Sequence, residues 1–190
     1  MTPLRLNDAQ IRLIFTKKPV FQHAQNVTGV PWQAIASIWF RESSLQERVG
    51  RIGGPFQFDP PLNAKQMTNL LEQFTHLDNA TRQDLIKKGI NDFASAAIFC
   101  ACWLRKSSRY PINPSASDEA IKDCFYGYNG RKYKSVDESA YVMNGYDLQH
   151  EHLHIKGTLP DHGKRIYIDK EDPRPGAFTV YKQLKALDSK

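Results

Sequence analysis

Apolar residues recur along most of the chain with the three- and four-residue spacing of an amphipathic helix. This spacing predicts helices over residues 6–18, 19–27, 31–42, 62–74, 79–89, 90–106, 117–130 and 177–187. Residues 43–62 interrupt the pattern with three glycines and three prolines, so we expect loop or short extended structure there. The pattern therefore predicts a mainly α fold with a small extended or loop segment.

The predicted helix over residues 90–106 differs from the others because it is apolar on almost every side. A helix of this kind is normally the buried central helix of its domain. Beyond residue 144 the periodic pattern weakens, and glycines and prolines recur until the last helix. We therefore predict one helical domain over residues 1–144, and an irregular extension over residues 145–190 that packs on the same domain.

Composition and charge narrow the class of protein. Hydrophobic residues make up 41% and charged residues 24% of the chain, which is ordinary for a folded globular protein. The net charge of +6 is shared equally between residues 1–95 and residues 96–190, so there is no segregated basic arm of the kind that binds nucleic acid. An acidic partner such as an anionic cell wall fits this charge, and we expect no nucleic-acid partner.

Neither a membrane span nor a secretory signal is expected. No apolar run reaches the roughly 20 residues that a membrane-spanning helix needs. The N-terminal residues lack the basic region, apolar run and cleavage site of a secretory signal, so we expect synthesis in the cytoplasm without a signal peptide. The three cysteines, Cys100, Cys102 and Cys124, are too few for a disulfide framework and are expected to be buried free thiols.

The first candidate for chemistry is Glu42, which ends the predicted helix over residues 31–42. It shares one helix face with Ile35, Ile38 and Trp39, because the four residues occupy positions i+7, i, i+3 and i+4. Partial burial and the negative end of the helix would both raise the pKa of its carboxyl group. A carboxylic acid that stays protonated near neutral pH can protonate the leaving oxygen in glycoside cleavage.

The loop after this helix is the second candidate. Residues 53–58 begin with two glycines, which permit a tight turn and a close approach of the backbone to a ligand. The following alternation of Phe56, Gln57 and Phe58 suits an edge that stacks on sugar rings and hydrogen-bonds their substituents. The alternative interpretation is a short strand with two core phenylalanines.

A third candidate is the pair Tyr128 and Asn129, which places a phenol and an amide where another apolar helix stripe ends. These groups could hydrogen-bond a carboxylate and the acyl group of a substrate. The alternative is a tyrosine that packs in the core and an asparagine that caps the helix. For Glu42 the corresponding alternative is a structural glutamate that pairs with Arg41 or Arg48, or that turns into solvent.

Together these segments resemble the lysozyme-like superfamily, most closely its lytic transglycosylase and goose-type lysozyme branch, which includes phage cell-wall lysins. The family pattern has a helix that ends in Glu-Ser, a Gly-rich turn that leads to Gln, an apolar helix and then Ala-Tyr-Asn. Here these pieces are Glu42-Ser43-Ser44, Gly54 to Phe58, Phe93 to Leu104, and Gly127-Tyr128-Asn129-Gly130. The resemblance covers about residues 30–130 and departs from the pattern in its Arg51-Ile52, in Gly127 and in the glycine that directly follows Asn129.

The resemblance implies an α+β lysozyme-like fold with a substrate cleft, and cleavage of the bond between N-acetylmuramic acid and N-acetylglucosamine in peptidoglycan. It implies that Glu42 is the general acid and base, and Asp59 is our candidate for a second carboxylate, with Glu47 after it. The substrate-binding residues expected on this basis are Ser43, Phe56, Gln57, Tyr128 and Asn129. Neither a metal nor another cofactor is expected, and the expected partner is the glycan strand.

A competing motif lies near the C-terminus. His150, Glu151 and His154 form a literal H-E-x-x-H, which on a helix can bind zinc with the glutamate as general base of a metallopeptidase. The glycines around it leave room for only a marginal helix, and on a strand His150, His152 and His154 would share one face as a generic surface pattern. A zinc metallopeptidase is therefore the alternative function.

A third class of function is a lysozyme-like module that binds glycan or builds part of a virion without turnover. The intact Glu42 and Gln57 favour an enzyme over such a module. The expected lack of a signal peptide fits a phage lysin that a holin releases or that a particle carries to the bacterial cell wall.

Overall fold

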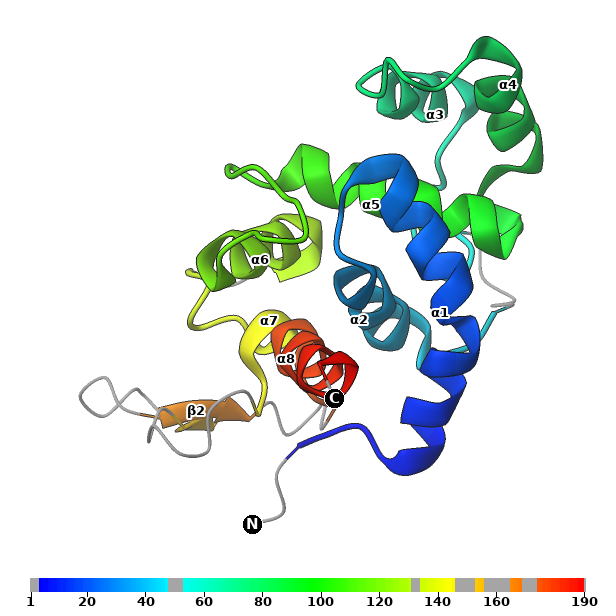
Figure 1. Cartoon of the computed structure of the whole chain (residues 1–190). Helices are drawn as coiled ribbons and strands as arrows, with labels where there is room; N and C mark the ends of the chain where they lie inside the picture. The colour runs from blue at the N-terminus through cyan, green and yellow to red at the C-terminus, as the bar shows by residue number, and fades with distance from the viewer. Residues whose placement is uncertain are drawn as a thin grey trace.

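The computed structural model describes residues 4–47, 53–130, 134–145, 153–155, 165–168 and 174–189, and it is mainly helical (Figure 1). This confirms the predicted mainly α class. The longer helices are α1 (Asp8–Thr28), α2 (Trp32–Ser43), α3 (Ala64–Leu71), α4 (Asn79–Lys88), α5 (Phe93–Ser107), α6 (Asp118–Phe125) and α8 (Ala177–Asp188). The shorter elements are a 3-10 turn (Gly89–Asn91), a π-helix (Tyr126–Gly130), α7 (Ala140–Met143), β1 (Leu153–Ile155) and β2 (Arg165–Ile168).

Helix α1 is continuous, whereas the sequence predicted two helices that meet at Pro19. The helix begins with a capping box, in which Asn7 and Gln10 exchange side-chain and backbone hydrogen bonds. A proline inside a helix removes one backbone hydrogen bond. The buried stripe nevertheless runs through Pro19, from Ile14 to Phe21 and beyond, so burial of one continuous face offsets this loss.

The core is built around α2, which packs against α1, α5 and α8, and Figure 1 shows α5 crossing behind α1. All residues of α5 from Ser95 to Cys102 are buried, which confirms the prediction of a buried central helix. Trp39 of α2 is fully buried, and its ring packs edge-on against Phe93 of α5 with the ring centres 5.0 Å apart. The three cysteines are free and buried, as expected.

Helices α3 and α4 form a small lobe that packs on one side of α5 (Figure 1). Helix α3 begins with a second capping box, formed by Asn63 and Gln66. The N-cap of α4 is Asp78, one residue before the predicted helix over residues 79–89, and its carboxylate accepts the backbone N–H of Thr81. Gly89 ends α4, as predicted.

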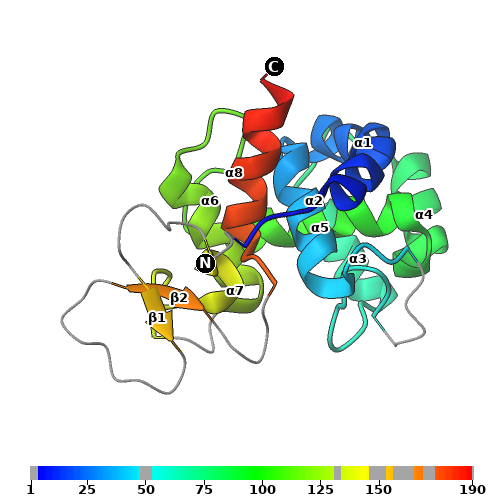
Figure 2. The same cartoon turned by 90° about the horizontal axis from the view of Figure 1, so that it is seen from below.

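The C-terminal residues return to the helical core. Helix α8 packs against α2, α6 and α7, and Phe178, Tyr181 and Leu184 bury their side chains there. Strands β1 and β2 pair in parallel as a two-stranded sheet beside α7, on the side of the molecule away from α4 (Figure 2). Helix α7 was not predicted, because four residues are too few for a helical period to be recognised.

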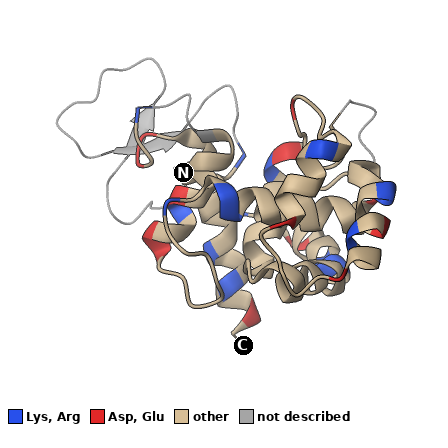
Figure 3. Cartoon of the chain, turned by 90° about the horizontal axis from the view of Figure 1, so that it is seen from above, with Lys and Arg blue, Asp and Glu red and all other residues tan. Residues whose placement is uncertain are grey.

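Basic and acidic residues are interspersed along the described elements (Figure 3). This distribution agrees with the even charge of the two halves of the sequence. Within the described ranges, no helix is long and apolar enough to cross a membrane.

Candidate active site

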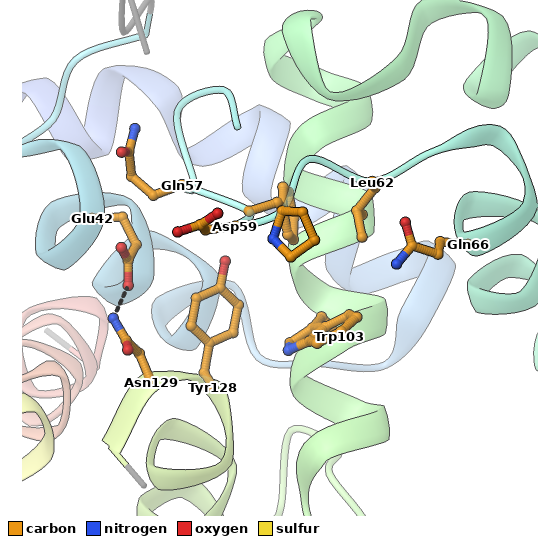
Figure 4. Close-up of a pocket in the computed structure, with 10 residues that line it drawn as sticks. Glu42, Gln57, Asp59, Leu62, Gln66, Trp103, Tyr128 and Asn129 are labelled. Atoms are coloured by element: carbon orange, nitrogen blue, oxygen red, sulfur yellow. Dashed lines mark hydrogen bonds between the residues drawn. The ribbon is translucent and has the colours of Figure 1, made fainter. Parts of the chain in front are cut away.

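One cavity lies between the end of α2, the loop that follows it, the α3–α4 lobe, α5 and the π-helix (Figure 4). Its volume is about 340 Å³, which is within the range of about 300–1,000 Å³ for small-molecule sites. The residues that line it are Glu42, Gln57, Phe58, Asp59, Pro60, Leu62, Gln66, Trp103, Tyr128 and Asn129. Five of the seven predicted site residues are therefore brought together at one cavity.

Glu42 is half-buried in the last turn of α2, on the face that carries Ile38 and Trp39 into the core. Two side chains donate hydrogen bonds to its carboxyl group, the Tyr141 hydroxyl at 2.6 Å and the Asn129 amide at 3.3 Å. Both donors reach the same oxygen, Oε1. The second oxygen, Oε2, accepts no hydrogen bond from the described residues, so it can carry a proton toward a ligand in the cavity.

The pKa of Glu42 is raised above its ordinary value of 4.5, because burial disfavours the charged carboxylate. The hydrogen bonds from Tyr141 and Asn129 act in the opposite direction, as do the charges of Arg41 and Arg174. Burial outweighs these four effects together. The site therefore holds a carboxyl group whose neutral form is favoured relative to that of a carboxyl group in water, as the helix position predicted.

Arg41 and Arg174 lower the pKa of Glu42 through their positive charges. Their guanidinium groups donate to backbone carbonyls, and these bonds join the end of α2 to the segment before α8. Arg41 donates to the backbone carbonyls of Arg174 and Pro175, at 3.3 Å and 3.2 Å. Arg174 donates to the carbonyl of Arg41 at 2.9 Å. The alternative of a Glu42–Arg41 ion pair is therefore not what the described contacts show, and Arg48 lies outside the described residues.

The loop over residues 53–58 is a tight turn rather than a strand. The backbone N–H of Phe58 donates to the carbonyl of Gly53, and that of Gln57 donates to Gly54. The side-chain amide of Gln57 also donates to the Gly54 carbonyl, at 3.0 Å, which leaves its carbonyl oxygen Oε1 available to a ligand. The Tyr128 hydroxyl donates to the Phe56 carbonyl at 2.7 Å, so it ties the loop to the π-helix.

The two candidates for a second carboxylate differ in position. Asp59 is exposed and lines the same cavity as Glu42, and its carboxylate points toward the side where Glu42 lies (Figure 4). Glu47 instead pairs with Lys17 at 2.7 Å and is not a lining residue. Asp59 is therefore the better placed of the two.

Two predicted substrate-binding residues, Ser43 and Phe56, do not reach the cavity. Ser43 is buried, and its hydroxyl donates to the Trp39 carbonyl at 2.9 Å within α2. Phe56 is fully buried and stacks on Phe93, with the ring centres 6.0 Å apart. The alternation of Phe56, Gln57 and Phe58 was recognised, but the turn directs Phe56 into the core, whereas Gln57 and the largely buried Phe58 line the cavity.

Three residues of the site were missed in the sequence. Tyr141 lies outside the segment that carries the family resemblance, on the short helix α7, and no periodic signal marks it. Trp103 belongs to the helix that was predicted to be buried on almost every side, but it is half-buried and lines the cavity. Gln66 is recognisable as the third residue of a capping box, although that pattern gives no sign of a role in a site.

The H-E-x-x-H motif is placed only in part. His150 and Glu151 lie outside the described residues, and His154 belongs to β1, whereas zinc binding by this motif uses a helix. Among the residues that the structure describes, no group of three or more His, Cys, Asp or Glu side chains could hold a metal ion.

The chain has no significant match among protein-family models, curated proteins or solved structures. The chemistry that the cavity can perform is therefore inferred from the residues that line it. They supply one half-buried carboxyl group with a raised pKa, one exposed carboxylate, three amide side chains and three aromatic rings that face a common space. This is a set suited to proton transfer onto an uncharged polar ligand.

Proposed function

We propose that the protein is a muralytic enzyme that cleaves the glycosidic bond between N-acetylmuramic acid and N-acetylglucosamine in peptidoglycan. The observation that carries this proposal is the arrangement around Glu42. Its pKa is raised by burial, both of its hydrogen-bond donors reach Oε1, and the group lines a cavity of about 340 Å³. The order of the four sequence motifs supports a lysozyme-like α+β fold, which is part of the proposal.

In this mechanism Glu42 transfers its proton to the glycosidic oxygen while the bond from that oxygen to the anomeric carbon breaks. Positive charge develops on the sugar as an oxocarbenium-like state, and the glutamate becomes a carboxylate. The carboxylate then takes a proton from water, which gives a reducing end, or from the muramoyl hydroxyl that closes an anhydro ring. In either case Tyr141 and Asn129 stabilise the carboxylate through Oε1 while it is charged.

The other cavity residues have separate roles in this proposal. Asp59, exposed on the same cavity, stabilises the positive charge or orients the attacking water. Gln57 presents Oε1 to an N-acetyl N–H, because its own amide is bound to Gly54. Tyr128 acts mainly as a positioning residue, since its hydroxyl is used by the Phe56 carbonyl.

The proposed setting is the bacterial cell wall, reached by a phage lysin that a holin releases or a virion carries. The net charge of +6 favours association with an anionic wall polymer.

The test of the function is digestion of purified peptidoglycan, followed by mass spectrometry of the soluble fragments. We expect disaccharide-peptide fragments that end in either an anhydro ring or a reducing sugar, and undiminished release when EDTA is present. Fragments cut only within the peptide, or release that EDTA abolishes, would instead support the metallopeptidase.

The Tyr141→Phe variant tests how the pKa of Glu42 is set. The hydroxyl of Tyr141 stabilises the charged carboxylate, so its removal should raise the pKa of Glu42 further. The alkaline limb of the pH profile of kcat/KM should then move to higher pH, because the protonated acid persists longer. We also expect kcat/KM at the optimum to fall about three- to tenfold from the loss of one orienting hydrogen bond.

A suitable control is Tyr110→Phe, because Tyr110 is 50% exposed and is not one of the two side chains that donate to Glu42. Its pH profile should match that of the parent. An alkaline limb that stays in place in Tyr141→Phe, or moves to lower pH, would show that this limb does not report Glu42.

A further inference from the structure

The cavity has a second end that the proposed chemistry does not use. Glu42 and Asn129 lie at one end, whereas Trp103 and Gln66 lie at the other, on α5 and on the α3–α4 lobe (Figure 4). Leu62 lies above Trp103 and completes this end. A polar amide and an aromatic ring therefore face the same space, away from the acid.

The side chain of Gln66 is oriented by the capping box of α3. Its Oε1 accepts the backbone N–H of Asn63 at 2.9 Å, and the Asn63 side chain accepts the Gln66 backbone N–H at 2.9 Å. The amide nitrogen Nε2 donates to no described residue, and Figure 4 shows it turned toward Trp103. The capping box thus fixes a hydrogen-bond donor at the cavity wall with little remaining rotational freedom.

Trp103 differs from the other two tryptophans of the chain. Trp32 and Trp39 are buried, and their indole N–H groups donate to Asp188 and to the carbonyl of Gln46. Trp103 is half-buried, and no acceptor for its indole N–H occurs in the described part of the chain. An accessible indole with an unused donor, beside a fixed amide, is an amphipathic surface that fits a sugar ring.

We propose that Trp103 and Gln66 form a saccharide-binding subsite, which holds an N-acetylated sugar next to the one on which Glu42 acts. The indole ring covers the apolar face of that sugar, and Gln66 Nε2 donates to its acetamido oxygen or a hydroxyl. This inference rests on the proposed function, because that function identifies the ligand as a glycan strand. The subsite makes the enzyme prefer long glycan strands over short fragments.

Binding is measured on the Glu42→Gln variant, so that the ligand is not consumed, with the tetramer of N-acetylglucosamine as probe. We expect the tryptophan emission to shift to shorter wavelength, because Trp103 loses contact with water. Trp103→Leu should abolish this shift and weaken binding about tenfold by calorimetry. Trp32→Phe, which alters a buried indole, should keep the shift.

Gln66 has a matched control in the chain itself. The capping box of α1 pairs Asn7 with Gln10 at the same two distances of 2.9 Å, and neither residue lines the cavity. Glutamate also forms a capping box, so Gln66→Glu and Gln10→Glu should keep their helices and change the charge equally. Only Gln66→Glu replaces a donor in the cavity by an acceptor, and we expect it alone to weaken tetramer binding, about tenfold.

The outcomes separate this inference from the proposed function. If the parent digests peptidoglycan while the tetramer binds the Trp103→Leu and Gln66→Glu variants unchanged, the subsite is wrong and the function stands. If the tetramer binds with the expected losses while peptidoglycan is not digested, the subsite stands and the glycosidase is wrong. Tetramer binding that leaves the tryptophan emission unchanged would also overturn the subsite.

Discussion

Replacement of Glu42 by glutamine is expected to lower the rate of peptidoglycan cleavage by about three orders of magnitude, the usual effect of losing a general acid. Glutamine has the shape of glutamate but cannot deliver a proton. Tyr141 and Asn129 both donate to Oε1, so an amide whose oxygen takes this position keeps both hydrogen bonds. The rate is measured from the clearing of a peptidoglycan suspension and from the soluble fragments.

The stability of the same variant shows whether the loss is chemical. Because burial raises the pKa of Glu42, the folded state binds its proton more tightly than the unfolded chain does. The tighter proton binding contributes to the free energy of unfolding. This contribution is fully present below the ordinary pKa of 4.5 and is lost as pH rises through the pKa of the folded state. The Glu42→Gln variant should therefore melt at a higher temperature than the parent at neutral pH, and the difference should shrink in acid.

Glu47→Gln provides the matched control. Glu47 follows the same helix, is exposed and pairs with Lys17, so its neutralisation should leave the cleavage rate within about twofold of the parent. Equal rates for the parent and Glu42→Gln would remove Glu42 from the mechanism. A Glu42→Gln variant that melts well below the parent would show that the carboxylate is needed for folding.

The helical frame was predictable because most of the helices bury apolar residues that recur at helical spacing. Glu42 could be placed on the core face of α2 from its spacing to Ile38 and Trp39 alone. The same logic failed at Pro19, where a local breaker was outweighed by the long-range burial of Ile14 and Phe21. Local signals describe the cost of a proline, but they do not include the packing that offsets it.

The rest of the site depends on contacts between segments far apart in the chain. Tyr141 meets Glu42 across 99 residues, and Tyr128 meets the Phe56 carbonyl across 72 residues. Neither contact has a periodic signature, because each is fixed by how separate helices pack. Trp103 shows the same limit, since a helix stripe does not reveal which of its members lies at the edge of the core.

Backbone strain also concentrates around the cavity. The non-glycine residues with positive φ in the described chain are Ser44, Leu45 and Gln57, at 52°, 69° and 53°. Two of them directly follow α2, and the third lines the cavity. Conformations of this kind cost free energy and persist where the surrounding structure holds them, often at functional sites. These conformations therefore adjoin two residues of the site, Glu42 at the end of α2 and Gln57 in the loop.

Gly54→Ala is expected to have the largest effect on stability among loop variants, because this turn also abuts the lobe. Gly54 has a φ of 67°, and a Cβ atom added there would lie 2.3 Å from the carbonyl oxygen of Ile90. That oxygen belongs to the backbone of the 3-10 turn that ends the lobe, so it cannot rotate away. We expect the free energy of unfolding in urea to fall by about 3–4 kcal/mol.

Gly29→Ala separates strain from collision. Gly29 has a φ of 77°, but its added Cβ would meet no atom closer than 3.9 Å, so only backbone strain of about 1 kcal/mol is expected. Gly54→Ala should also lower the cleavage rate in the fraction that stays folded, because the displaced turn carries Gln57 and Asp59. Equal losses of stability in the two variants would show that the turn can shift away from Ile90 at little cost. The close approach of loop and lobe would then not be what positions the site.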